Sequence, residues 1–563
     1  MLKNKIMNDN NQNIKFSGSG AGFTEEEKQI LNKYVTSTED NVFAIKNLPG
    51  IVGAAYARYS RAKGGFRETL LKEFIKEGHV DPKHADELIA RVLVAYGDDS
   101  VGELEGTHVS FEKISMLATK EIEDRRIGGS PIEQSTRYVF YDQKVEHGNW
   151  LYYRGEDVKN STFGKDYLKT MDFIFETYAS LVEPMKAYFE KLKSIEMAEY
   201  DINGDGVKEK WSDLQDEALQ KAFKTTYNFD LRSKACDTLR CLLPLSTLTN
   251  VGMFGNGRFF QTLISHLITT DIPEVQDIGI KTLKATSEVI PQYVKRGKRN
   301  EYVVANRNNM FALVRKLFGE SKAKKVKNLP QVELLKAPSK FDIQILASML
   351  FPFANKSIKD LRTFIKKTPE DIRQEIARTY LGERKTRRDR PGRALEEGYP
   401  YTFEMVTNWG VYKDLMRHRM NTQQRQLFTT ELGFDMPEEL KLAGFEEQAK
   451  QCVSKSRKLF KLIAAENPLL AQYAVLHGNF VRWTMGLNDR AAMHLIELRT
   501  TPQGHPQYRK VGQMMHQEIA KVSKWRAEAM KFVDYNDYYW SRADSEAKQR
   551  VKEAELDKKY DKQ

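Results

Sequence analysis

The sequence contains two divergent copies of one ancestral unit, and this duplication constrains the fold more than any other feature. Residues 111–125 align with residues 403–417 at an offset of 292 (403 − 111). A later pair of blocks, residues 256–258 and 488–490, is offset by 232 (488 − 256). The first copy therefore carries about 60 more residues than the second between its two blocks (292 − 232). We expect two related folding units in tandem, the first with a large insertion.

The length and composition are those of a globular protein with several domains. The chain has 563 residues, enough for two to four domains, and 40% of them are hydrophobic. We expect a disordered N-terminus (1–22), a first repeat (23–295) with an insertion at about 140–235, a basic linker (296–330), a second repeat (331–543) and a charged C-terminal tail (544–563). Helices are expected at 24–38, 50–62, 66–77, 83–96 and 232–243.

The net charge and the cysteine content restrict the partners and the compartment. A net charge of +12 favours anionic partners, which include nucleotides, phosphorylated cofactors and nucleic acid. The three cysteines are too few and too irregularly spaced for a zinc site or a disulfide framework, which fits a reducing compartment. No segment has the apolar run of a signal peptide or of a membrane span. We therefore expect a soluble, cytoplasmic protein without a metal site.

A strand, a short helix and a basic triplet follow one another in the second copy. Residues 400–408 alternate apolar and polar side chains, which predicts a strand, and residues 409–416 are typical of a short helix. The helix delivers Arg417-His418-Arg419 at its C-terminal end. Three such side chains cannot all be buried without anionic partners. Cations are also favourable at any helix C-terminus, so a solvated helix end remains an alternative.

This triplet and the residues around its counterpart in the first copy resemble the signature of flavin-dependent thymidylate synthase, the ThyX family, which in this chain is split between the two copies. The second copy has the Arg-His-Arg front of the motif, but Leu427 and Thr429 occupy the later serine and arginine positions. The first copy has Arg125-Arg126-Ile127 in place of the triplet. It keeps the rear of the motif, namely Glu133, Gln134, Ser135, Arg137 and Tyr138.

Two later landmarks of the family are divided between the copies in the same way. Arg240 precedes Leu243-Pro244 as the family's phosphate-binding arginine does, whereas the second copy has Gln472 there. Arg499 matches the arginine that activates the uracil ring, whereas the first copy has Leu267. Each copy has lost what the other keeps. Judged by residue type alone, Arg240 could equally be a surface side chain with a buried stem.

The resemblance implies an α+β fold, helix-rich overall, in which each repeat is a small antiparallel sheet flanked by helices. It implies reductive methylation of dUMP to dTMP, with FAD as cofactor and with NADPH and methylenetetrahydrofolate as co-substrates. Family members are homotetramers whose sites are shared between subunits, so we expect composite sites between unlike repeats and a homodimer that forms a pseudo-tetramer.

The resemblance also assigns the candidate site residues. The catalytic residue is Arg499, beside the uracil. The residues expected to bind dUMP are Glu133, Gln134, Ser135, Arg137, Arg240, Arg417 and Arg499. Those expected to bind FAD are Arg417, His418, Arg419, Asn488, Arg490 and His494. Glu105 lies near a cofactor-contacting loop, and its counterpart is Glu396 or Glu397.

Several features depart from the family or allow another interpretation. Asp414 replaces a usual glutamine, and His494 replaces a usual amide and could simply be a packed polar residue. A non-catalytic flavin or nucleotide binder is one alternative function. A basic nucleic-acid-binding protein is another, which would use loops 296–330 and 383–393, although neither loop interleaves aromatic residues with its charges. Residues 201–206 resemble the opening of a calcium loop, but such pairs also form ordinary turns.

Overall fold

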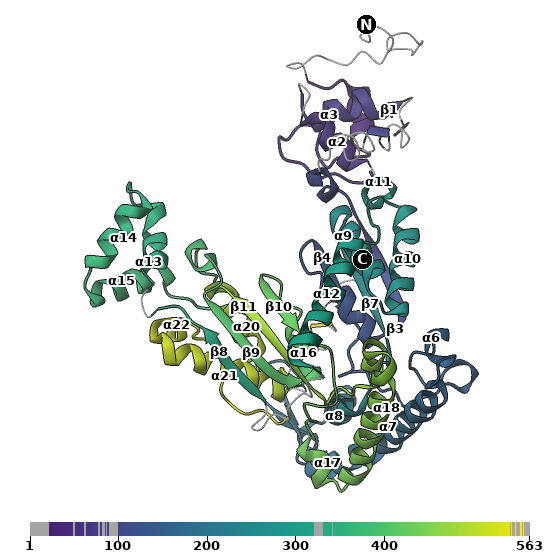
Figure 1. Ribbon diagram of the computed structural model, residues 1–563. Helices are drawn as coiled ribbons and strands as arrows, with labels where there is room; N and C mark the ends of the chain where they lie inside the picture. Colours follow the sequence, from purple (N-terminus) through teal and green to yellow (C-terminus); the bar gives the residue numbers. More distant parts are fainter. Residues whose placement is uncertain are drawn as a thin grey trace. The chain divides into compact units, whose positions relative to one another are not determined.

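The computed structural model (Figure 1) describes most of the chain and divides it into two compact units. The described residues are 22–48, 51–60, 64–76, 79–80, 85, 87–88, 99–319, 330–339, 342–540, 542, 547, 552–553 and 556. Unit 1 comprises residues 1–111, 127–132 and 251–312, and unit 2 comprises residues 112–126, 133–250 and 313–563. The disorder expected at the N-terminus and most of the helix expected at 83–96 lie outside the described residues.

The fold class is α+β and helix-rich, as expected, with small antiparallel sheets. In unit 1, the helices expected near residues 24–77 are α1 (Glu25–Leu31), α2 (Val52–Tyr59) and α3 (Phe66–Thr69). The later helices of this unit are α9 (Gly257–Thr269), α10 (Pro273–Ser287) and α11 (Pro291–Val294). Asn256 caps α9, because its side chain accepts a hydrogen bond from the backbone of Phe259.

Two sheets carry the repeated strands. The first copy has the order β3-β7-β4, formed by β3 (Gly106–Ser115), β7 (Leu248–Asn256) and β4 (Gly129–Glu133). The second copy has the order β10-β11-β9-β8, formed by β10 (Asn421–Arg425), β11 (Phe480–Leu487), β9 (Tyr401–Asn408) and β8 (Gln331–Lys336). The strand predicted at 400–408 is therefore confirmed, and Tyr401, Phe403 and Met405 are buried as its alternation requires.

The predicted short helix of the second copy is α16 (Trp409–Leu415), and its counterpart is α5 (Met116–Glu123). Both begin on a polar cap: Ser115 accepts from Ala118, and Asn408 accepts from Val411. Helices α20 (Asp489–Arg499) and α21 (Pro506–Val522) pack against each other and lie along the second sheet (Figure 1).

The insertion of the first copy is mostly helical. It contributes α6 (Glu156–Lys159), α7 (Gly164–Leu192) and α8 (Glu217–Leu239), and α7 packs against both α8 and α18 (Glu446–Glu466) (Figure 1). The remaining helices are α12 (Glu301–Phe318), α13 (Ile343–Leu350), α14 (Ile358–Lys367), α15 (Glu370–Leu381), α17 (Glu438–Leu442), α19 (Pro468–Ala471) and α22 (Lys524–Ala529). Among the described residues, no helix combines the length and the apolar character needed to cross a membrane.

Backbone hydrogen bonds repeat from one copy to the other. The first amide of α5 donates to the carbonyl of Thr247, and the first amide of α16 donates to the carbonyl of Asn479. The acceptors are offset by 232 (479 − 247), which is the offset of the later sequence blocks. Likewise, Gln134 donates to Asn250 and Gln426 donates to Arg482, with offsets of 292 (426 − 134) and again 232 (482 − 250).

The two copies meet about a local twofold axis inside unit 2. Pro244 and Leu476 form an isolated antiparallel bridge, and they are equivalent positions because their offset is 232 (476 − 244). The bridge therefore pairs a position with its own counterpart. The flanking hydrogen bonds obey the same symmetry: Leu245 N donates to Val475 O, and His477 N donates to Leu243 O. Unlike repeats of one chain thus pair as two subunits would.

Candidate functional site

The arginines that the sequence divides between the copies converge on one carboxylate. Asp414, on α16, lies 3.6 Å from the guanidinium of Arg240, which follows α8. Burial opposes the ionisation of Asp414, but Arg240 first, then Arg417, Arg137 and Arg499 outweigh it and lower its pKa to about 2. The candidate phosphate-binding arginines of the first copy thus share one environment with the second copy's Arg417 and Arg499.

The ring of Tyr508 joins the same two sets of residues. The guanidinium carbon of Arg137 lies 5.9 Å from the ring centroid, and that of Arg499 lies 5.5 Å from it. Arg137 also donates from Nε and Nη2 to the two carboxylate oxygens of Asp237, each at 2.7 Å. The structure therefore brings the candidate phosphate-binding arginine and the candidate uracil arginine together within one chain.

Glu133 lies in the protein interior, where it is the counter-ion of a cationic cluster. Its side chain has no exposed area, and it pairs with Lys413 at 3.0 Å, with Lys120 at 3.1 Å and with Arg417. The two lysines occupy equivalent helix positions, offset by 293 (413 − 120), as are the first residues of the two helices. Glu123 completes the cluster by pairing with Lys120. Glu133 therefore fixes Arg417 and is enclosed by cations.

His418 and Arg499 are linked by a hydrogen bond. Nε of Arg499 donates to Nε2 of His418 at 2.8 Å. Burial, and then the charges of Arg499 and His494, keep the pKa of His418 well below its usual value. His418 is therefore a neutral acceptor that orients the guanidinium. The rings of His418 and His494 meet edge to face at 5.8 Å.

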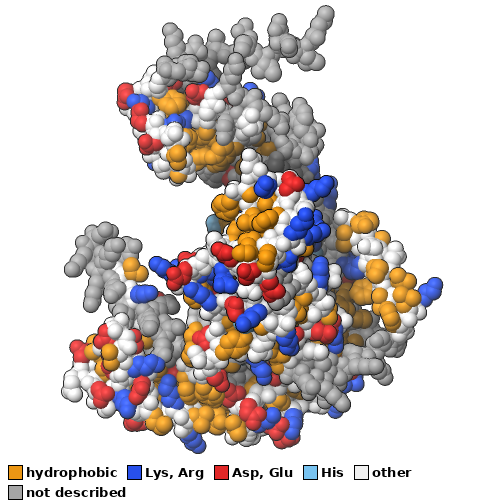
Figure 2. Space-filling model, turned by 90° about the vertical axis from the view of Figure 1, so that its left-hand side faces the viewer, with side chains coloured by type: hydrophobic (Ala, Val, Ile, Leu, Met, Phe, Trp, Pro, Cys, Tyr) orange, Lys and Arg blue, Asp and Glu red, His pale blue; other side chains and the backbone are white. Residues whose placement is uncertain are grey.

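A cavity of about 710 Å³ opens beside this pair, and seven arginines are among the described residues that line it. Its lining residues from the second copy include Arg384, Arg387, Arg390, Glu396, Arg417, His418, Arg419, Asn488, Arg490, His494 and Arg499. All six residues expected to bind FAD therefore line one cavity. On the face shown in Figure 2, Lys and Arg side chains are interspersed with Asp and Glu, whereas Glu396 supplies the single carboxylate among the described residues that line this cavity.

Two of the cavity residues are held by other groups. Asn488 caps α20, because Oδ1 accepts from the backbone of Ala491 at 2.7 Å, and its Nδ2 donates to the carbonyl of Glu396 at 3.3 Å. Arg490 forms an ion pair with the carboxylate of Glu396. Between the two expected counterparts of Glu105, the structure thus singles out Glu396 as the one that lines the cavity.

Sequence reasoning considered the 383–393 loop only as a nucleic-acid contact and missed its contribution to the cavity. Arg384 is buried and donates through two nitrogens to the carboxylate of Glu497 on α20, each at 2.7 Å. Arg387 and Arg390 line the cavity. The signal lay in Glu497, a buried carboxylate two residues before Arg499 on α20, which requires a cationic partner.

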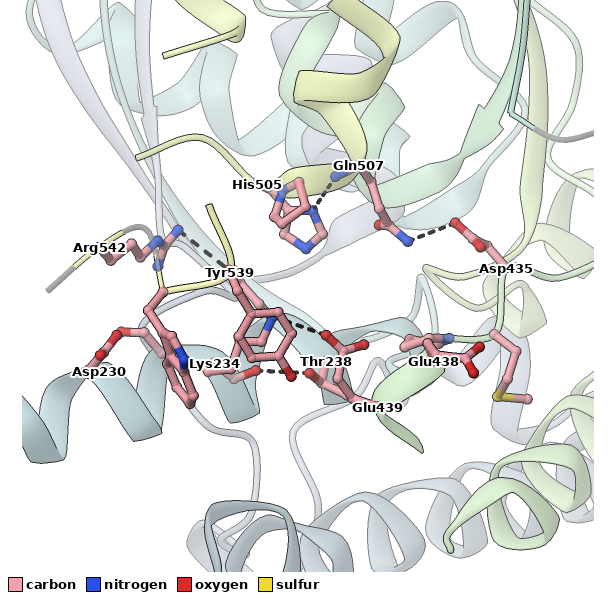
Figure 3. A pocket seen from close by; sticks show the side chains of 16 residues that line it. Asp230, Lys234, Thr238, Asp435, Glu438, Glu439, His505, Gln507, Tyr539 and Arg542 are labelled. Atoms are coloured by element: carbon pink, nitrogen blue, oxygen red, sulfur yellow. Dashed lines mark hydrogen bonds and ion pairs between the residues drawn. The ribbon is translucent and has the colours of Figure 1, made fainter. Parts of the chain in front are cut away.

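A second cavity of about 310 Å³ has Asp237 in its lining and is shown in Figure 3. Its lining includes Lys234 and Asp237 of α8, His505, which caps α21, Gln507 of α21, and Arg542. Gln507 donates to Asp435 across this cavity (Figure 3). Sequence reasoning assigned no role to Arg542. The guanidinium of Arg542 donates to the carbonyl of Arg137 at 3.3 Å and lies 4.0 Å from Asp237.

The structure also shows the local contacts of Ser135, of Gln134 and of the loop that resembles a calcium site. Ser135 accepts a hydrogen bond from the backbone of Arg137 at 3.2 Å, and the amide oxygen of Gln134 accepts from Asn250 at 3.1 Å. In the loop that resembles a calcium site, the carboxylate of Asp201 accepts from the backbones of Gly204 and Gly206, as in an ordinary turn. In the part of the chain that the structure describes, no three His, Cys, Asp or Glu side chains are grouped to hold a metal.

Comparison with known proteins gives one family and several relatives. The family model described as thymidylate synthase complementing protein matches residues 49–292 and 359–523, one region in each copy, which confirms the tandem duplication. A UPF0159 protein of Chlamydia pneumoniae is 36% identical over 547 residues, which are 94% of this chain and 98% of that protein. A UPF0159 protein of Chlamydia muridarum is 35% identical over 94% of this chain and 99% of its own length.

More distant similarity extends to an archaeon and to a solved structure. A UPF0159 protein of Thermoplasma acidophilum is 30% identical over 89% of this chain and 98% of that protein. The crystal structure of a UMP/dUMP methylase PolB from Streptomyces cacaoi, bound with 5-Br dUMP, matches with a TM-score of 0.30 and 16% identity. That match covers 37% of this chain and 96% of the methylase chain.

Proposed function

The chain belongs to the thymidylate synthase complementing protein family, and from this premise we propose that it is a flavin-dependent thymidylate synthase. The proposed reaction is the reductive methylation of dUMP to dTMP with methylenetetrahydrofolate and NADPH. The observation that carries the proposal is the convergence of Arg137 and Arg240 from one copy with Arg417 and Arg499 from the other around Asp414. Drift in a non-catalytic protein would not preserve complementary halves of one site.

The first-copy arginines suit the phosphate of dUMP. Nη2 of Arg240 is buried and has no hydrogen-bond partner in the described part of the chain. Arg137 uses Nε and Nη2 on Asp237, which leaves Nη1 for a ligand. A phosphate would satisfy both groups with charge-assisted hydrogen bonds. We expect Ser135 to help shape this subsite through the turn that it forms with Arg137.

Arg499 suits the uracil ring. The ring must gain negative character during methylation, and a cation that is already oriented stabilises that charge without reorganisation. Arg499 is oriented by its hydrogen bond to neutral His418. A preorganised donor of this kind contributes roughly 3–4 kcal/mol to transition-state stabilisation.

The cationic cavity suits FAD. Its pyrophosphate requires cations and its flavin requires hydrogen-bonding edges, and the lining offers both through Arg417, His418, Arg419, Asn488, Arg490 and His494. FAD would supply the hydride that originates in NADPH. The protein would bind and orient FAD and dUMP and would polarise the uracil ring. Asn488 and Arg490 are held by Glu396, so we expect them to shape the wall as well as to contact the cofactor.

We further propose a cytoplasmic homodimer without membrane or nucleic-acid partners. Members of the resembled family are homotetramers in which each subunit corresponds to one copy. Two chains with two copies each would supply the same four copies. The local twofold axis between Pro244 and Leu476 pairs the two copies within one chain. Light scattering after size exclusion would give the mass of two chains.

The decisive experiment is dTMP formation by purified protein supplied with FAD, NADPH, methylenetetrahydrofolate and dUMP. Wild-type protein should form dTMP, and Arg499→Leu should lose about 100- to 1,000-fold in kcat. Arg457→Leu, which alters an exposed arginine of α18, is the matched control and should retain full activity. The absence of dTMP from wild type, with flavin bound, would establish the non-catalytic alternative, and an unimpaired Arg499→Leu variant would refute the assignment of Arg499.

A further inference from the structure

Two arginines of the loop at 383–393 line the cavity without a counter-ion among the described residues. Arg387 and Arg390 make no ion pair or side-chain hydrogen bond within the described residues, although both line the cavity. Other arginines of the same wall are matched: Arg384 pairs with Glu497, and Arg490 pairs with Glu396. Cations gathered in a concave, partly desolvated surface attract an anion more strongly than the same cations on a convex surface.

The loop that carries these two arginines is internally fixed. The carboxylate of Asp389 accepts from the backbones of Lys385 at 2.8 Å and Thr386 at 2.7 Å. Arg384 anchors the same turn by donating to the carbonyl of Asp389 at 2.7 Å. A loop fixed in this way loses little conformational entropy when it binds a ligand.

The guanidinium groups of Arg387 and Arg390 both lie near His494 in the cavity. The pKa of His494 is lowered first by burial and next by the charges of Arg390 and Arg387, so the three side chains share one region. His494 projects from α20, which also carries Arg490 and Arg499. Arg387 and Arg390 are thus part of the cavity that the proposed function assigns to the cofactor.

We propose that Arg387 and Arg390 form the subsite for the pyrophosphate of a dinucleotide ligand. The inference deepens the proposed function and rests on it for the identity of that ligand as FAD. Two guanidiniums three residues apart offer paired donors to two linked phosphates, whereas Arg417 and Arg490 already neutralise Glu133 and Glu396. A monophosphate would need only one of the two.

The test compares full-length wild type with Arg387→Gln, Arg390→Gln and the double variant. Arg388→Gln is the matched control, since Arg388 is an exposed arginine of the same loop that does not line the cavity. Flavin fluorescence titrations measure the affinities for FAD, FMN and riboflavin. Each single substitution should weaken FAD about tenfold, and the double variant about 100-fold, while riboflavin affinity stays unchanged. Inorganic pyrophosphate should compete with FAD in wild type and in the control.

Several results would refute the proposal that Arg387 and Arg390 form this subsite. One is a double variant that binds FAD and pyrophosphate as tightly as Arg388→Gln. Another is an equal loss of riboflavin affinity, which would mean that the loop only shapes the cavity. A third is loss of duplex DNA retention without loss of FAD affinity, which would identify a nucleic-acid contact.

These readouts separate the subsite from the proposed function because they need no turnover. If wild type forms no dTMP but the double variant loses FAD and pyrophosphate, the subsite stands and the catalytic proposal fails. If wild type forms dTMP and the double variant keeps its affinity for both probes, the catalytic proposal stands and the subsite fails. Calorimetric titration with inorganic pyrophosphate alone applies the same test without flavin.

Discussion

The buried cluster around Glu133 makes a quantitative prediction about stability. Glu133→Gln keeps the shape of the side chain and removes one of two carboxylates that face Lys120, Lys413 and Arg417. The side chains of Glu133 and both lysines are at most 3% exposed, so water cannot replace the lost charge. The folded variant must therefore either carry an excess buried cation or release a proton.

The magnitude follows from the less costly of these two responses. Removing one partner of a buried ion pair costs roughly 3–5 kcal/mol. Deprotonating a lysine of ordinary pKa, near 10.4, at pH 7 costs at most about 4.6 kcal/mol. Burial already lowers the pKa of Lys413, so its neutralisation costs less than that limit. We expect Glu133→Gln to lower the free energy of unfolding by about 3–4 kcal/mol at pH 7.

The pH dependence identifies the mechanism. We expect Lys413 to release its proton in the folded variant, because burial already lowers its pKa, whereas in the unfolded chain it stays protonated up to about pH 10.4. The unfolded state then binds more protons, so stability rises with pH. Between pH 7 and pH 9 the deficit relative to wild type should shrink by up to about 2.7 kcal/mol.

Urea unfolding followed by tryptophan fluorescence measures this deficit. The curves should be recorded at pH 7 and pH 9 for wild type, Glu133→Gln and the double variant Glu133→Gln/Lys413→Met. The double variant should regain most of the lost stability, because it removes the unpaired cation. Glu438→Gln, which alters an exposed carboxylate of α17, is the control. A deficit below about 1 kcal/mol, or one that is equal at the two pH values, would refute this account of the cluster.

Two further predictions concern the other buried charges. Arg384→Gln leaves Glu497 buried without its cation, so the free energy of unfolding should fall by about 3–5 kcal/mol and scanning fluorimetry should show a Tm lower by about 10 °C; an unchanged Tm would contradict the buried pair. Asp414→Asn should tighten dUMP binding about tenfold at low salt, because it removes a carboxylate beside Arg240; weaker binding in calorimetry would show instead that Asp414 orients Arg240. The depressed pKa of Asp414, about 2, means that its contribution to wild-type stability is complete above its unfolded pKa, near 3.9, and is lost as pH falls through 2.

The sequence predicted the fold class, the duplication and the second-copy strand and helix because these depend on local patterns. The alternation at 400–408 is visible without any tertiary contact. The expectation that the triplet could not be buried without anions agrees with the ion pair between Arg417 and Glu133, a partner that the pattern itself did not identify. Glu133 was assigned to dUMP because it lies within the motif, yet its side chain faces Lys120 and Lys413.

The remaining features depend on contacts between distant segments. The loop at 383–393 has the composition of a solvated basic loop, and only the position of Glu497 places Arg384 in the interior. Similarly, Arg542 reaches Asp237 across about 300 residues of sequence (542 − 237). A charge run has no local signal for which of its members face a cavity, so tertiary structure was needed to separate Arg387 and Arg390 from Arg388.

The local twofold axis relates two copies that differ in sequence, and this explains how the copies could diverge. In a symmetric pair of identical units, a substitution appears in every site, so the loss of a phosphate-binding or uracil-binding arginine removes it everywhere. In this chain the unlike copies pair internally, and Lys120 and Lys413 meet the single carboxylate of Glu133. The position equivalent to Glu133 is Arg425 (133 + 292), which pairs instead with Glu121. Pairing two second copies would therefore bring two such lysines together without that carboxylate. The cost of those unpaired buried cations favours the unlike pairing, in which the site residues kept by each copy complete one another.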